Sequence, residues 1–228
     1  MNDLNAILAP LWERFLDKLP EILTATWETL EMVFLSTLFS MIIGFALAIV
    51  MILTNPIGLK PRRSFYSAVD FVVNLLRSFP FIILLIAIIP LTRLIVGTSI
   101  GSTAAIVPLT IAAAPFVARL IEASFLEVDR GVIEAARSFG ASNSQIIFRV
   151  LLPEALPSII LNIAVIAITL LGYSAMAGTV GGGGLGDLAV RYGYNRFQLD
   201  IMVYAVIILC VLVLLIQGVC NFLYKALR

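Results

Sequence analysis

The sequence has few residues of the kinds that catalyse reactions or bind metals. It contains no histidine, which removes histidine-based metal sites and histidine general-base catalysis. The two cysteines, Cys210 and Cys220, share one apolar run and would lie about 15 Å apart on a single helix, too far for a disulfide. We therefore interpret them as buried apolar thiols and expect no catalytic residue, metal or cofactor.

A glycine-rich run offers one apparent nucleotide motif. Gly181, Gly183 and Gly186 satisfy the G-x-G-x-x-G spacing, but a dinucleotide site needs a strand before the glycines. Here a long apolar helix precedes them, and Asp187 stands where a phosphate-binding loop needs lysine. We interpret the run as a flexible outer loop or re-entrant turn, where a docked protein or a substrate can approach the backbone.

Residues 127–157 carry signals for two short helices between apolar spans. Asp129 can cap a first helix, which Gly140 would end. Ser142 opens a capping-box pattern, and the second helix is expected to stop before Pro153. Both helices have one apolar face, so the segment is predicted to form a surface knob for another protein.

Seven residues of this knob resemble the EAA loop of ABC importer permeases: Glu134, Ala135, Ala136, Gly140, Val150, Leu152 and Pro153. All the spacings match, and the departure is Val150 in place of isoleucine. The resemblance implies docking into a groove of a separate ATP-hydrolysing subunit. An alanine pair permits close approach, Glu134 can meet a basic residue, and Gly140 can set the angle between helices. The alternative is an ordinary amphipathic connector.

Other motifs are similar to those of methionine-importer permeases. They are residues 77–81, 90–93, 96–101, 104–110, 172–178, 181–186 and 191–194. The resemblance runs from about residue 32 to the end of the chain. It implies a type I ABC importer permease that works as a homodimer with two ATP-binding subunits and an external substrate-binding protein. The implied cargo is an amino acid, methionine in its D or L form; another polar amino acid is the alternative.

Small residues surround Met176 in one of the apolar runs. Gly172, Ser174 and Gly178 would allow either close helix packing or a narrow pore crossed by one larger side chain. Taking the resemblance into account, we predict that Met176 forms a hydrophobic constriction, with Tyr173 and Ser174 beside it. Simple helix packing is the competing interpretation.

The composition predicts that these elements lie in a membrane. The chain is 61% hydrophobic and 13% charged, against about 25% charged residues in soluble domains. Apolar runs predict spans at 32–54, 102–125, within 155–186 and at 201–224. A fifth span is expected at 71–92, although it contains Arg77 and two prolines. The predicted fold is one domain, residues 1–228, an all-α membrane protein with five transmembrane helices and a two-helix cytoplasmic loop.

The distribution of basic residues predicts the orientation in a bacterial inner membrane. Loops that include 127–157 carry twice as many Lys and Arg residues as the loops of the other side, which makes them cytoplasmic. Residues 1–31 then form an outer segment, and the C-terminus is cytoplasmic. The net charge of +1 argues against nucleic acid as a partner. A secondary transporter is disfavoured, because the four clear spans have no charges at their centres.

Overall fold

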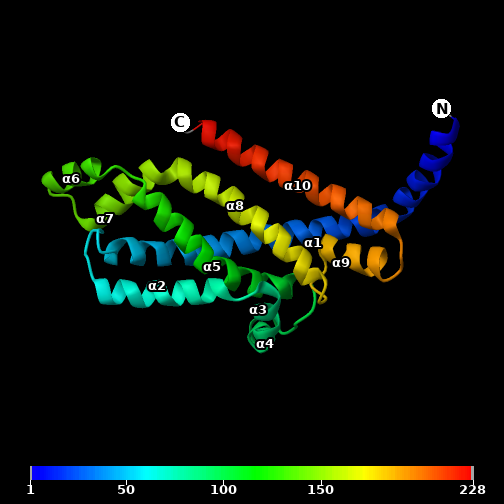
Figure 1. The fold of residues 1–228 in the computed structure, drawn as a ribbon, viewed down its shortest axis with the longest axis horizontal. Helices are drawn as coiled ribbons and strands as arrows, with labels where there is room; N and C mark the ends of the chain where they lie inside the picture. Colours follow the sequence, from blue (N-terminus) through cyan, green and yellow to red (C-terminus); the bar gives the residue numbers. More distant parts are fainter. Residues whose placement is uncertain (1, 227–228) are drawn as a thin grey trace.

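The computed structural model describes the backbone of residues 2–226 and the side chains of residues 14–226. All regular structure in that part of the chain is helical (Figure 1). The elements in order are α1 (Asn2–Thr54), α2 (Arg63–Ser78), α3 (Phe81–Ala87), α4 (Ile89–Val96), α5 (Ser102–Leu126), α6 (Arg130–Ser138), α7 (Asn143–Ile146), the π-helical turn η1 (Ile147–Leu151), α8 (Leu152–Gly178), α9 (Gly184–Leu188), the π-helical turn η2 (Ala189–Tyr194) and α10 (Leu199–Ala226).

Helix α1 is much longer than one membrane crossing. Its 53 residues extend for about 80 Å at 1.5 Å per residue, against a hydrocarbon core of about 30 Å. The sequence predicted a separate segment over residues 1–31, whereas the backbone continues through this boundary as one helix. No proline or glycine lies between Pro20 and Gly44, so no residue in that stretch ends the helix.

The expected fifth span at 71–92 is not one continuous helix. Helices α2 and α3 meet at a bend of 98°, and α4 follows after another break. The bend falls at Phe79–Pro80, because Phe79 takes the extended backbone that a following proline favours. Four helices in the described residues are long and apolar enough to span: Arg14–Thr54, Ser102–Leu126, Asn143–Gly178 and Leu199–Ala226. A fifth span results only if α2 and α3 count as one broken span.

Three apolar clusters hold the described helices together, and the smallest, formed by Met51, Val73 and Ala118, joins α1, α2 and α5. The largest joins α1, α5 and α8 through residues such as Ile52, Val117 and Leu170. Helices α1 and α5 approach so closely that a β-carbon on Gly44 would lie 2.5 Å from a methyl group of Val117. The second cluster joins the N-terminal half of α1 to α8, α9, η2 and α10.

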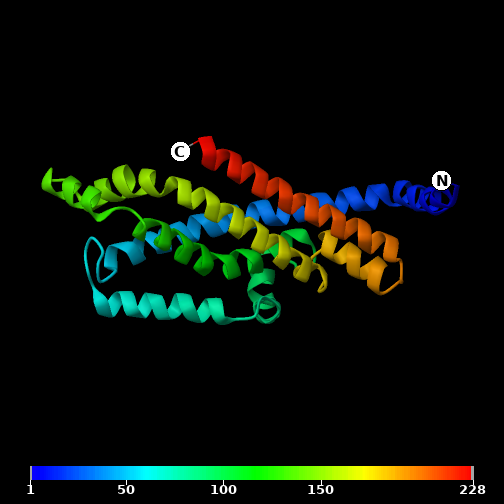
Figure 2. The same cartoon turned by 45° about the horizontal axis from the view of Figure 1, so that its top comes forward.

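The clusters leave an elongated molecule with two distinct ends. Helices α6 and α7 lie at one end, and the N-terminal end of α1 lies at the other, as both views show (Figures 1 and 2). Helix α10 starts near α9, on the side of the molecule where the N-terminal end of α1 lies, and runs back towards the end that carries α6.

Candidate functional site

The predicted capping interactions of the surface knob are present. Asp129 accepts a hydrogen bond from the backbone N–H of Gly131 at 2.6 Å, at the start of α6. Gly140 has φ +80°, the left-handed backbone that ends helices. The Ser142 hydroxyl accepts from Gln145 N–H at 3.4 Å, and Gln145 Oε1 accepts from Ser142 N–H at 2.8 Å. The capping box is therefore confirmed.

The second helix of the knob does not stop before Pro153, which corrects the prediction. Residues Asn143–Gly178 form one helical run through α7, η1 and α8. Pro153 has no N–H to donate to a carbonyl of the preceding turn. The helix continues past it because the wider π-helical turn η1 comes directly before α8. Because Ile147 and Leu151 are buried, the motif residues from Val150 onwards are joined rigidly to the core.

The first half of the knob presents an open surface. Glu134 and Ala135 are exposed, and Ala136 is half-buried against the main cluster. Phe139 is 89% exposed at the tip. The sequence pattern places Phe139 on the apolar face of the first helix together with Val132 and Ala136, and the structure leaves its side chain open. A bare phenylalanine beside an alanine pair is suited to an apolar pocket of a partner.

A hydrogen bond joins the knob to the connection between α1 and α2. Nη2 of Arg137 donates to the carbonyl of Leu59 at 2.9 Å. A pocket of about 140 Å³ lies between this connection and α6, with Glu134 and Arg137 on its lining. The orientation of α6 therefore depends on where the ends of α1 and α2 lie.

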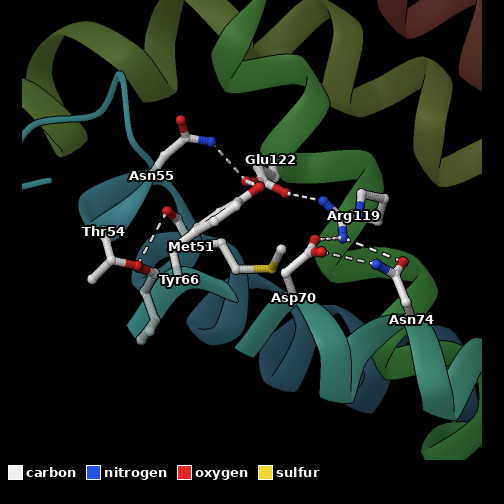
Figure 3. Close-up of polar contacts among 9 residues, drawn as sticks. Met51, Thr54, Asn55, Tyr66, Asp70, Asn74, Arg119 and Glu122 are labelled. Atoms are coloured by element: carbon white, nitrogen blue, oxygen red, sulfur yellow. Dashed lines mark hydrogen bonds and ion pairs between the residues drawn. The ribbon is translucent and has the colours of Figure 1, made fainter. Parts of the chain in front are cut away.

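Those ends are tied together by a buried carboxylate, Glu122 of α5, which is 1% exposed (Figure 3). The hydroxyl of Tyr66 donates to Glu122 Oε1 at 2.9 Å, and Nδ2 of Asn55 donates to the same oxygen at 3.2 Å. Nη1 of Arg119 donates to Glu122 Oε2 at 2.8 Å. A buried charge is tolerated only when it is paired and hydrogen-bonded, and Glu122 meets both conditions.

The same arginine carries the network on to α2. Nη2 of Arg119 contacts Asp70 Oδ1 and donates to Asn74 Oδ1 at 3.3 Å, and Asn74 donates to Asp70 at 3.1 Å (Figure 3). We call Asn55, Tyr66, Asp70, Asn74, Arg119 and Glu122 the α1–α2–α5 network. The sequence analysis missed it. The available signal was the opposite charges of Arg119 and Glu122, three residues apart near the end of an apolar helix.

The predicted constriction residues fall on different faces of α8. Met176 is 49% exposed at the subunit surface, one turn after the exposed Gly172. Ser174 is 2% exposed, and its hydroxyl donates to the carbonyl of Leu171 at 2.8 Å. Tyr173 is half-buried and stacks on Phe81 of α3, with ring centroids 4.6 Å apart. Within the subunit, Ser174 therefore faces the core and does not share a face with Met176.

The glycine-rich run packs against α1. Gly184 N–H donates to Glu28 Oε2 at 2.7 Å, and Leu185 N–H donates to Thr29 Oγ1 at 2.8 Å, so α1 caps the start of α9. Gly183 has φ +75°, and a β-carbon there would lie 2.7 Å from Glu28 Oε2. These glycines are explained by a close contact within the chain and not by a nucleotide or an open loop.

Comparison with known proteins identifies the class. Residues 40–228 match the family described as "Binding-protein-dependent transport system inner membrane component". The chain is 54% identical over 198 residues, 87% of its length and 88% of the relative, to the probable D-methionine transport system permease protein MetI of Vibrio cholerae serotype O1. It is 49% identical over 157 residues to D-methionine transport system permease protein MetI of Escherichia coli K12, covering 69% and 72% of the two chains.

Solved structures agree with this assignment. A chain of the MetNI methionine ABC transporter in an inward-facing conformation has a TM-score of 0.89 at 45% identity, covering 91% of this chain and 96% of that one. A chain of an amino acid ABC transporter crystallised with histidines has a TM-score of 0.77 at 20% identity, covering 93% and 97%, which supports the fold alone.

The fold is that of a type I ABC importer permease. The chain belongs to the family of inner-membrane components of binding-protein-dependent transport systems.

Proposed function

We propose that this chain forms the translocation pathway of an ATP-driven methionine importer. The continuous helix Asn143–Gly178 carries the mechanism, because it joins part of the EAA-like motif to Met176. The distance from Val150 to Met176 along this helix is about 39 Å at 1.5 Å per residue. A tilt imposed at the knob by a partner is therefore transmitted to the level of Met176. The two relatives that share about half of their residues with this chain support methionine as the cargo.

The energy comes from separate subunits in this proposal. The knob, with Glu134, Ala135, Ala136 and Gly140 on α6 and at its end, docks on an ATP-binding subunit, one for each of two permease copies. The chain itself hydrolyses no nucleotide in this proposal, because its one apparent motif follows the long helix α8 and lacks the preceding strand that a dinucleotide site needs. No metal or cofactor is required for this role, and the outer end of the molecule receives a substrate-binding protein that delivers the cargo.

The two ends of the molecule correspond to the two sides of the inner membrane. In this proposal the knob is cytoplasmic and the N-terminal end of α1 is external, an assignment that the excess of Lys and Arg in the loops on the knob's side supports. The two features lie at opposite ends of the long axis, as two sides of a membrane require (Figure 1). Helix α10 brings the C-terminus back towards the cytoplasmic side. Met176, half-exposed on the subunit surface, is available to meet its counterpart from a second copy and close the pathway.

Reconstitution tests the function directly. The permease is purified with its ATP-binding subunit, placed in liposomes and supplied with the binding protein and ATP. We expect accumulation of labelled L- and D-methionine, and no accumulation when a non-hydrolysable ATP analogue replaces ATP. Accumulation of another amino acid in preference to methionine would contradict the cargo. ATP-independent accumulation driven by an ion gradient would contradict the class of transporter.

A further inference from the structure

The end of α8 and the short helix α9 pack into one unit, residues 175–188, which we call the α8–α9 elbow. A β-carbon on Gly178 would lie 2.3 Å from a backbone nitrogen of α9, and one on Gly186 would lie 2.3 Å from the carbonyl oxygen of Ala175. No side chain fits at either position, so the two helices touch through their backbones. Met176 lies between these contacts along α8 and is half-exposed. The position of Met176 is therefore set by where the elbow lies.

Two neighbouring side chains of α1 hold the elbow. Glu28 Oε2 accepts a hydrogen bond from Gly184 N–H at 2.7 Å, and Thr29 Oγ1 accepts one from Leu185 N–H at 2.8 Å. These donors are the first two N–H groups of α9, which no carbonyl of the same helix can satisfy. Gly184, Leu185 and Thr29 are buried, and Glu28 is half-buried. The elbow is therefore fixed to α1 by two side chains that lie far from it in sequence.

The backbone of the elbow is shaped for this contact. Gly184 has φ +76°, which L side chains rarely adopt, and a β-carbon there would lie 2.7 Å from Thr29 Oγ1. The connection between α4 and α5 adds a bond to the same turn, because Gly101 N–H donates to the carbonyl of Gly181 at 2.9 Å. Glycine at these positions lets α1 and the α4–α5 connection reach the elbow backbone directly.

The two hydrogen bonds do something that the surrounding apolar packing cannot. Apolar contacts also join α1 to α9, through residues such as Ile22, Val33 and Leu185. Apolar attraction has no preferred direction, whereas a hydrogen bond holds donor and acceptor within a narrow range of distance and angle. The bonds from Glu28 and Thr29 therefore fix where the elbow sits along α1. Loss of one bond should leave the helices packed but free the elbow to shift.

We propose that Glu28 and Thr29 are positioning residues of the translocation pathway: they hold the α8–α9 elbow on α1 and so keep Met176 in its closing position while the transporter is idle. This role rests on the proposed import function and adds α1 to the elements that control the constriction. Neither side chain contacts the cargo in this role, because both act through α9 and the end of α8. A weakened hold on the elbow should therefore let ions pass at rest.

The test uses the complete permease–ATPase complex in liposomes, without the binding protein, and measures ion flux driven by a membrane potential. Glu28→Ala removes the acceptor of Gly184 N–H, and Thr29→Val removes that of Leu185 N–H at nearly constant volume. We expect each variant to raise the resting flux by about threefold or more, because a displaced constriction admits water. Glu28→Gln keeps an acceptor oxygen on a side chain of the same length and should stay close to the parent.

Controls separate positioning from stability. Thr24→Val is matched to Thr29→Val, because the Thr24 hydroxyl donates to the carbonyl of Pro20 within α1 and does not reach the elbow. It should leave the resting flux unchanged. The unfolding midpoint and co-purification of the ATPase are measured for every variant. A merely structural role would lower the midpoint or the yield without raising the flux through complexes that assemble.

A double variant tests whether the two side chains act through Met176. Glu28→Ala combined with Met176→Ala should leak no more than Met176→Ala alone, since both changes open the same constriction. A higher flux in the double variant would overturn the proposal, as would parent-like flux in assembled Thr29→Val and Glu28→Ala complexes. Absence of methionine uptake by the parent in liposomes would instead contradict the proposed function, so the two failures are distinguishable.

Discussion

At the scale of single residues, Glu122 and Met176 have opposite environments and opposite consequences when changed. Glu122 is buried and receives hydrogen bonds from three side chains of three chain segments. Met176 is half-exposed and has no role in the main cluster. We therefore expect substitution of Glu122 to affect stability first, and substitution of Met176 to affect the proposed pathway between two copies of the permease.

Replacing Glu122 with glutamine should destabilise the permease by about 1.5–3 kcal/mol, the range for hydrogen bonds to a charged group. The variant keeps the size of the side chain but removes the charge that Arg119 and Tyr66 bind. The measurement is the unfolding midpoint in mixed detergent micelles. Glu154→Gln, at an exposed carboxylate on α8, is the control and should leave the midpoint unchanged. An unchanged midpoint for Glu122→Gln would mean that the network does not hold α1, α2 and α5 together.

Replacing Met176 with alanine should raise the resting ion leak of liposomes that contain the transporter. A hydrophobic constriction blocks ions by excluding water. The methyl group of alanine fills less of the pathway than the thioether side chain of methionine, so the variant should admit water and ions. Met176→Trp should instead block methionine uptake while the ATPase still binds. Ion flux driven by a membrane potential is the measurement, with Val165→Ala, an exposed residue of the same helix, as the control. A tight Met176→Ala variant would place the constriction elsewhere.

At the scale of elements, the knob combines the exposed helix α6 with the rigid start of the long helical run Asn143–Gly178. Helix α6 has no buried residue, while the run from Ile146 leads straight into the core. The bond from Arg137 to Leu59 connects α6 to the α1–α2 end, which the α1–α2–α5 network fixes. The docking surface is therefore supported from two directions, by α8 and by the network.

Changing the surface of this knob should uncouple transport without removing the subunit from the membrane. Gly140→Asp introduces a charge and strains a position with φ +80°, although a β-carbon would meet no atom within 4 Å. Glu134→Arg reverses a charge on the exposed face of α6. We expect both variants to lose co-purification of the ATPase and methionine uptake. Arg93→Glu, on α4 and outside the knob, should retain the ATPase. Normal uptake by both knob variants would exclude the proposed docking role.

At the scale of the whole molecule, the bend between α2 and α3 determines how many times the chain crosses the membrane. If α2 and α3 form one broken span, there are five crossings and the two termini lie on opposite sides. The direction of α10, which runs back from the α1 end towards the knob, agrees with this count (Figure 2).

Reporter fusions test this topology. An enzyme that is active only in the cytosol should work when fused after Arg228 or inserted at residues 142–144, and should fail when fused before Met1. An insertion at residues 142–144 disrupts the capping box, so the fusion after Arg228 is the main measurement. A reporter that is active only in the periplasm, fused before Met1, provides the complementary measurement. Cytosolic activity at both termini would show an even number of crossings and would remove the α2–α3 pair from the spans.

The sequence by itself determined the features that depend on near neighbours. The cap at Asp129, the capping box at Ser142 and the left-handed turn at Gly140 each involve residues within about four positions, so they were predicted correctly. Four long apolar helices followed from composition, because a charge-free run of sufficient length is helical in lipid. The motif spacing pointed to the family that the comparisons then identified.

Only the tertiary structure decided which faces and which distant residues meet. A helix that is apolar all round has no polar face to mark its outside, so the burial of Ser174 and the exposure of Met176 could not be read from periodicity. The bond from Asn55 to Glu122 joins residues far apart in sequence, and the 98° bend places Arg77 beside a pocket formed by four helices. These relations depend on helix rotation and close approach, such as that of Gly44 to Val117, which the packing of the whole bundle sets.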